Sequence, residues 1–172
     1  MAKQAYPFTK HDHGNALLER SGTALLIGLC LEQQVHSAKA MIGPYELQQR
    51  IGHLDARKIA KMKPAALDKV FREEPALHRF PGMMAKRVQK LCGVIADEYA
   101  NHGERVWTGV SKAAELYDRF LALPGFGDGK AAAAVRILAT FGGHKTTGWQ
   151  KYSSPEDMPW TYKDGVIERP AD

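Results

Sequence analysis

The sequence predicts an all-α protein in which short helices pack around one core. The chain has 172 residues, of which 44% are hydrophobic, and this is enough for a single domain with a buried interior. In several segments apolar residues recur every three or four positions, as they do on the buried face of a helix. No segment alternates convincingly as a strand does, and no internal repeat is visible.

Prolines, glycines and capping residues place the helix ends. Pro44 and Pro64 are suited to the first turn of a helix, and Asp55 is suited to an N-cap. The segment from Leu17 to Leu31 is strongly apolar and predicts a central helix that is buried on most sides. We expect helices at residues 17–31, 44–51, 55–62, 64–71, 83–101, 111–121 and 128–141.

Two of these helices have a clear inner face. The helix at 111–121, with Ser111 as its N-cap, is expected to bury Ala114, Tyr117 and Leu121. In the helix at 128–141 the inner positions are Ala131, Ala134, Val135 and Leu138.

The two ends of the chain differ from the helical body, which we expect to span residues 16–143. Residues 1–15 are expected to form a flexible lead-in. Residues 144–172 are rich in Pro, Gly, Ser, Thr and charge, and predict an irregular C-terminal segment. Its isolated aromatic residues, such as Trp149 and Tyr152, favour anchoring along the domain over a partly disordered tail. His11 and His13 flank an aspartate but lie in the lead-in, so no metal site is expected.

Composition and charge restrict the function classes. The net charge is +5, and residues 145–172 hold four basic and five acidic side chains, which leaves +6 on the rest. A basic body permits a polyanionic partner. No apolar run approaches the ~20 residues of a membrane span, and the first residues lack a secretory signal, so we expect a cytoplasmic protein with no membrane partner. Two cysteines are too few for a cysteine-ligated iron–sulfur cluster, and no cofactor is expected.

The most informative local motif is Leu123-Pro124-Gly125-Phe126-Gly127, between the last two expected helices. Two glycines two positions apart let the backbone turn sharply and approach a ligand closely. The N–H groups of these glycines and of the next helical turn point toward the hairpin, where the helix dipole also favours a phosphate. Lys130 is expected to add positive charge there, the alternative being a solvated lysine beside a plain turn.

A second motif precedes the hairpin by about ninety residues, and it reads Leu25-Leu26-Ile27-Gly28-Leu29-Cys30-Leu31-Glu32-Gln33-Gln34. Together the two motifs resemble those of the helix-hairpin-helix (HhH-GPD) DNA glycosylase superfamily of base excision repair, over roughly residues 16–143. The resemblance implies a bilobal helical fold with a DNA-reading surface along its cleft. It also implies a monomer that is associated with the nucleoid and binds double-stranded DNA. A monovalent cation at the hairpin is compatible with the resemblance.

The resemblance assigns DNA-binding roles to both motifs. Gln34 aligns with the residue that fills the gap left when a nucleotide is taken out of the stack, and Gln33 lies beside it. An amide suits this position because it is flat and can both donate to and accept from the orphaned base. The hairpin residues Gly125, Phe126 and Gly127 are expected to hold the phosphates near the lesion.

A third element of the resemblance is the turn Phe80-Pro81-Gly82 and the helix start that follows it. In relatives this place touches DNA opposite the hairpin. Lys86 and Arg87 are expected to contact phosphate there. Met83 or Met84 either wedges against a base step or packs in the core.

The sequence departs from the family at its catalytic positions. Active relatives place an aspartate about twenty residues past the hairpin, and this slot here holds Thr147. Relatives that form a Schiff base use a hairpin lysine, whose slot here holds Gly129. We therefore expect a DNA glycosylase without lyase activity, that is, an N-glycosyl hydrolase.

Three alternatives remain for the missing carboxylate, which would stabilise the developing sugar cation. Asp157 or Glu156 enters the cleft with the C-terminal segment, or Glu32 substitutes, or the protein binds DNA without cleaving it. Glu32 is disfavoured because on a continuous helix it would lie about 200° around the axis from Gln34. A helical protein–protein adaptor, with the hairpin as a plain turn, is a further class.

Overall fold

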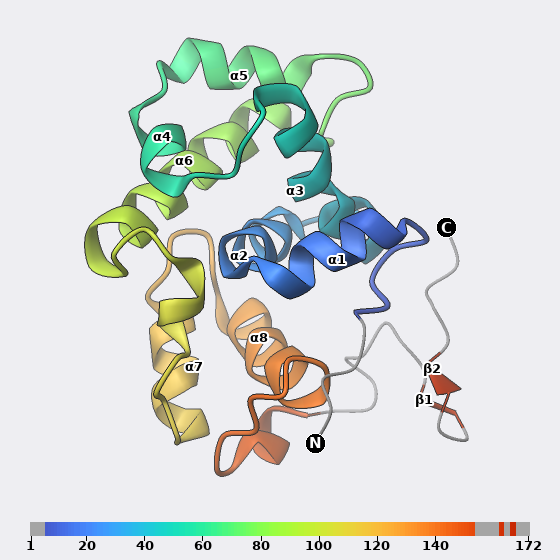
Figure 1. Ribbon diagram of the computed structural model, residues 1–172, viewed down its shortest axis with the longest axis vertical. Coiled ribbons are helices and arrows are strands. Elements are labelled where there is room, and N and C mark those ends of the chain that lie inside the picture. The colour runs from blue at the N-terminus through green and yellow to red at the C-terminus, as the bar shows by residue number, and fades with distance from the viewer. Residues whose placement is uncertain (1–5, 154–161, 164–165, 168–172) are drawn as a thin grey trace.

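The computed structural model describes residues 6–153, 162–163 and 166–167 (Figure 1). Within them the chain forms α1 (Asp12–Arg20), α2 (Gly22–Leu31), α3 (Ser37–Ile51), α4 (Ala56–Lys61), α5 (Pro64–Arg72), α6 (Pro81–Glu98), η1 (Gly103–Val106), α7 (Ala113–Leu121), α8 (Asp128–Thr140) and η2 (Trp149–Tyr152). The strands β1 (Tyr162–Lys163) and β2 (Val166–Ile167) pair antiparallel. The all-α prediction is confirmed, and this two-residue strand pair is an addition that the sequence pattern did not predict.

α2 is the central helix of the molecule. All ten of its residues are buried, and it packs against α1, α3, α6, α8 and η1. The predicted burial is confirmed, but the helix expected at 17–31 is two helices. Ser21 has extended backbone (φ −124°, ψ 110°), ends α1, and caps α2 by accepting a hydrogen bond from the Ala24 N–H at 3.1 Å.

The remaining helices form two lobes, with α1 and α2 between them (Figure 1). In one lobe α4 and α5 pack on α6, and α3 packs on α2 and α5. In the other lobe α7 and α8 pack on each other. Within the part of the chain described, no helix has the length and apolarity needed to cross a membrane.

Two helices differ from their predicted limits. α3 begins at Ser37, so Pro44 lies inside it and does not open it. α7 begins at Ala113 and its N-cap is Lys112, so Ser111 is not the cap. The Ser111 carbonyl accepts from the Thr147 N–H at 2.8 Å. A one-residue change of phase rotates the inner face by about 100°. The buried residues of α7 are therefore Ala113, Leu116 and Phe120 in place of the predicted Ala114, Tyr117 and Leu121.

The N-terminal segment from residue 6 is packed, which corrects the expectation of a flexible lead-in through residue 15. Tyr6 and Phe8 are buried, and their rings lie 6.3 and 5.6 Å from that of Phe141, centroid to centroid. Asn15 in α1 accepts a hydrogen bond from the Thr9 N–H and donates one to the Thr9 carbonyl, both at 2.9 Å. The packed body thus includes residues whose place near the N-terminus had suggested a mobile end.

Residues 144–153 lie along α7 and α8. The backbone of Thr147 is hydrogen-bonded to the start of α7. Further on, the Tyr152 ring stacks on Tyr117 of α7 with centroids 4.9 Å apart, and Arg136 of α8 donates to the Tyr152 carbonyl at 2.7 Å. An aromatic residue therefore anchors this stretch along the two helices that flank the hairpin.

Candidate nucleic-acid interface

The hairpin between α7 and α8 is held down by its phenylalanine. Phe126 is 7% exposed and stacks on Phe120 of α7, with ring centroids 6.3 Å apart. Its N–H donates to the Leu123 carbonyl at 3.1 Å. The side chain of Phe126 therefore anchors the turn in the core, and the DNA contact expected of this residue stays a prediction. Gly125 has φ +81°, a conformation that glycine adopts without strain, and its Cα faces the Cys30 sulfur of α2.

Hairpin N–H groups are available to a ligand. Gly125 and Gly127 are exposed, and neither N–H donates a hydrogen bond within the described residues. Gly127 precedes α8, and its carbonyl accepts the first helical hydrogen bond, from Ala131 at 3.0 Å. A carboxylate also stands at this helix start, since Asp128 accepts from the Tyr117 hydroxyl at 2.6 Å. This bond raises the pKa of Tyr117 to about 12.

Lys130 ties the hairpin to the central helix. Its ammonium donates to the Cys30 carbonyl at the end of α2, at 2.8 Å, and to the Gly125 carbonyl, at 3.1 Å. Burial lowers the pKa of Lys130, which is half-buried. Two of the three N–H donors of Lys130 thus bond carbonyl oxygens. One of these, the Cys30 carbonyl, lies in the last turn of α2, where carbonyls have no partner within the helix.

The paired glutamines lie in an irregular turn directly after α2. α2 ends at Leu31, and Glu32 is its C-cap. Gln33 donates its N–H to the Leu31 carbonyl at 2.8 Å, and its side-chain oxygen accepts a hydrogen bond from Arg87 of α6. Gln34 has a left-handed backbone (φ +54°) and an exposed side chain. The turn therefore fixes one amide to the protein and presents the other to solvent.

His78 joins this turn to the loop before α6, and the sequence analysis missed it. Its Nδ1 accepts from the Phe80 N–H at 2.9 Å, so its Nε2 carries the proton and donates to the Leu31 carbonyl at 2.9 Å. The ring is buried, and burial lowers its pKa. A lone histidine ahead of a Pro-Gly turn gives no signal of this role. Its neighbour Arg79 is exposed and lies over the Phe80 ring, 5.3 Å from the centroid.

The two methionines at the start of α6 differ in burial. Met84 is fully buried, so the core alternative holds for it, whereas Met83 is 39% exposed and the base-step contact stays a prediction for this residue. Lys86 is exposed, and Arg87 is half-buried because it contacts the hairpin and Gln33. A Cβ added to Gly125 would lie 3.7 Å from Arg87 Cδ.

The structure thus gathers Gln33, Arg87, Gly125 and Lys130 around the end of α2, with Gln34 and Lys86 exposed. The slot of the family aspartate lies elsewhere. Thr147 is bonded to the start of α7, whereas the hairpin follows the end of that helix. A nine-residue helix is about 14 Å long, so the uncharged Thr147 is distant from the hairpin. Glu156 and Asp157 lie outside the described residues.

A pocket of about 360 Å³ opens between the end of α2 and α8. Glu32 lines it, and the Ser37 hydroxyl at the start of α3 donates to its carboxylate. The argument against Glu32 fails because α2 stops at Leu31, so no helix continues through the glutamines. The other lining residues come from α8, and they are Gly129, Lys130, Ala132, Ala133 and Arg136.

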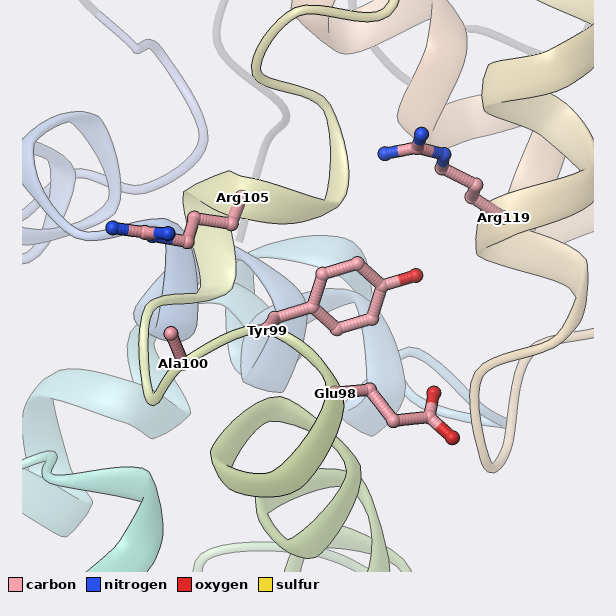
Figure 2. Close-up of a pocket in the computed structure, with 5 residues that line it drawn as sticks. All are labelled: Glu98, Tyr99, Ala100, Arg105 and Arg119. Atoms are coloured by element: carbon pink, nitrogen blue, oxygen red, sulfur yellow. The ribbon is translucent and has the colours of Figure 1, made fainter.

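A second, larger pocket of about 470 Å³ lies where α6, η1 and α7 meet. Figure 2 shows the Tyr99 ring between Arg105 and Arg119, with Glu98 on the last turn of α6. Arg119 donates to the Val106 carbonyl at 3.2 Å and to Glu115 at 3.0 Å, which joins α7 to η1. None of the predicted site residues lines this pocket. In the described ranges no three side chains of the metal-binding types come together.

These features define a two-lobed helical fold with a hairpin set against its central helix. It is the fold of Endonuclease III: a structure of a non-covalent Endonuclease III–DNA complex matches with a TM-score of 0.52 and 20% identity, over 80% of this chain and 57% of that one. A trapped Endonuclease III–DNA covalent intermediate with an estranged adenine matches with a TM-score of 0.51 and 18% identity, over 77% and 57%. This chain therefore spans less than two thirds of either neighbour. No family model matches the sequence, and no curated protein does.

Proposed function

We propose that this protein acts in base excision repair as a DNA glycosylase of the helix-hairpin-helix kind, binding duplex DNA through its hairpin. The observation that carries the proposal is that the hairpin, the turn with Gln33 and Gln34, and α6 meet at the C-terminal end of α2. Lys130 links the hairpin to α2, and Arg87 links α6 to Gln33. The likeness of the fold to two Endonuclease III–DNA complexes supports the same reading.

Gln34 is the residue that we propose to enter the duplex. Taking a nucleotide out of the stack costs a few kcal/mol, and a flat amide in the gap recovers part of that cost by bonding the orphaned base. Its exposed side chain stands on a turn that Gln33 and His78 fix to the protein. Because this turn is already rigid, less conformational entropy is lost when the Gln34 side chain inserts.

Phosphate contacts come from two sides of this turn. The free N–H groups of Gly125 and Gly127 bind one strand. A monovalent cation at the hairpin would be held by carbonyl oxygens and not by these N–H groups. Lys86, with Arg87 behind it, contacts phosphate on the other side. These contacts position the duplex without reading its sequence, and one copy of the chain supplies all of them.

The reaction is hydrolysis of the N-glycosidic bond without lyase chemistry, because Gly129 occupies the lysine slot. Asp157 and Glu156 are the carboxylates that the sequence offers from the C-terminal segment. They follow Tyr152, which is anchored on α7, by five and four residues.

A catalytically inactive DNA-binding protein is the second candidate, and the uncharged Thr147 in the aspartate slot favours it. Base release from duplexes that carry deaminated, alkylated or oxidised bases separates the two. Release of a base by the wild type supports the glycosylase. Intact duplex binding with no product from any lesion selects the inactive binder.

A further inference from the structure

The pocket between α2 and α8 adjoins both halves of the proposed DNA site. Glu32, on its α2 side, is followed directly by Gln33 and Gln34. Gly129 and Lys130, on its α8 side, belong to the first helical turn after the hairpin. A nucleotide extruded between Gln34 and the hairpin phosphates would therefore have this pocket beside it. Its volume of about 360 Å³ is in the range of small-molecule sites.

Glu32 is the carboxylate among the described residues that lines this pocket. The Ser37 hydroxyl donates to one carboxylate oxygen and so fixes the side chain, while the second oxygen remains as an acceptor. The pKa of Lys130 is lowered mainly by burial. The negative charge of Glu32, across the pocket, acts in the opposite direction and raises it. The pocket thus places a fixed carboxylate near cationic side chains. The carboxylate suits a sugar that becomes positive, and the cations suit the two phosphates that flank this sugar.

Resting on the proposed glycosylase function, we propose that Glu32 is the catalytic carboxylate of this protein and that the pocket between α2 and α8 takes the extruded deoxyribose. The bond between C1′ and the base nitrogen breaks, and its electron pair leaves with the base, which takes up a proton from solvent. Glu32 stabilises the cation at C1′. A water oxygen then bonds to C1′, and Glu32 accepts the proton that this water loses.

The test uses sugar analogues, because they need no knowledge of the lesion. One duplex carries an abasic pyrrolidine, whose ring nitrogen is cationic like the sugar in the transition state, and the other carries a neutral tetrahydrofuran. A carboxylate beside C1′ predicts that the full chain binds the cationic duplex about tenfold or more tightly than the neutral one. Glu32→Gln keeps an acceptor for Ser37 but removes the charge, and we expect it to reduce this ratio to within about twofold.

Three variants serve as controls. Ser37→Ala removes the hydrogen bond and keeps the charge, so the preference for the cationic duplex should persist. Glu156→Gln and Asp157→Asn should leave the preference unchanged if Glu32 is the carboxylate. Circular dichroism and binding of the neutral duplex report whether each variant is folded.

Every outcome decides the proposal. A preference that Glu32→Gln abolishes supports it. A preference that survives in Glu32→Gln, or disappears in Asp157→Asn or Glu156→Gln, overturns it in favour of another carboxylate. Equal affinity of the wild type for both duplexes overturns the role of Glu32 while duplex binding stands. Failure to bind either duplex overturns the proposed function as well.

Discussion

The ammonium of Lys130 donates to the carbonyl oxygen of Cys30 at 2.8 Å, across one hundred positions of sequence. The same ammonium reaches Gly125 in the hairpin. One side chain therefore sets the distance between the hairpin and the end of the central helix, from which the exposed Gln34 follows.

Replacing Lys130 with methionine should lower the free energy of unfolding by about 1–2 kcal/mol, because two carbonyls lose a charged donor. Urea denaturation measures this change. Lys90→Met, at an exposed position of α6, is the matched control and should change stability by less than about 0.5 kcal/mol. Equal effects of the two substitutions would show that Lys130 does not join the hairpin to α2.

Phe126→Ala should destabilise the protein by about 2–4 kcal/mol, since the ring is buried against Phe120. Leu121→Ala, at a 38% exposed position just before the hairpin, should have little effect. Urea unfolding of both variants gives the comparison. A Phe126→Ala variant that keeps full stability but loses DNA binding would show instead that the ring contacts DNA.

Stability should fall as the pH drops below the ordinary pKa of histidine, and His78 should account for part of this fall. Burial lowers its pKa in the folded state, so between the folded and unfolded pKa values the unfolded chain binds more protons. The contribution of His78 is complete above about pH 6.5 and is lost as the pH decreases toward the folded value. His78→Gln keeps a side-chain donor for Leu31, and its unfolding free energy should depend less on pH. Parallel pH profiles of wild type and variant would contradict this.

Gln34→Ala should reduce binding to a duplex with an abasic site about tenfold and change binding to intact duplex much less, because only the abasic duplex leaves a gap to fill. Alanine keeps the Cβ that Gln34 already carries at this left-handed position, so it adds no new backbone strain. Gln34→Gly, which adopts φ +54° freely, removes the same amide and serves as a second test. Both variants should show the same loss in fluorescence anisotropy titrations. Unchanged binding of the abasic duplex in both variants would contradict the role of Gln34.

The sequence predicted the parts of the fold that depend on local pattern. Apolar spacing gave the burial of α2 and the inner face of α8, and glycine spacing gave the hairpin. It placed the buried face of α7 one residue too late, since Ala113, Leu116 and Phe120 face the core. It also took Ser111 as the cap, whereas the Ser111 carbonyl bonds Thr147 in a contact between distant segments.

The candidate site was predictable in its residue types and less so in its geometry. Gln33, Arg87, Gly125 and Lys130 do converge, but their partners are carbonyls and side chains from other helices, which no local pattern encodes. Glu32 was set aside on the assumption of a continuous helix. The left-handed Gln34 follows a helix that has already ended, so angles on a helical wheel do not apply there.

The most direct test of the central claim, that the hairpin binds the DNA backbone, is the salt dependence of duplex affinity in wild type and Gly127→Val. A side chain at Gly127 meets no atom within 4 Å, so the variant should fold, yet its bulk would keep a phosphate from the hairpin N–H groups. Gly93→Val, in open space on α6, is the control. We predict that wild-type affinity falls steeply with salt and that only Gly127→Val weakens it, by about tenfold or more. Unchanged affinity in folded Gly127→Val would contradict the account.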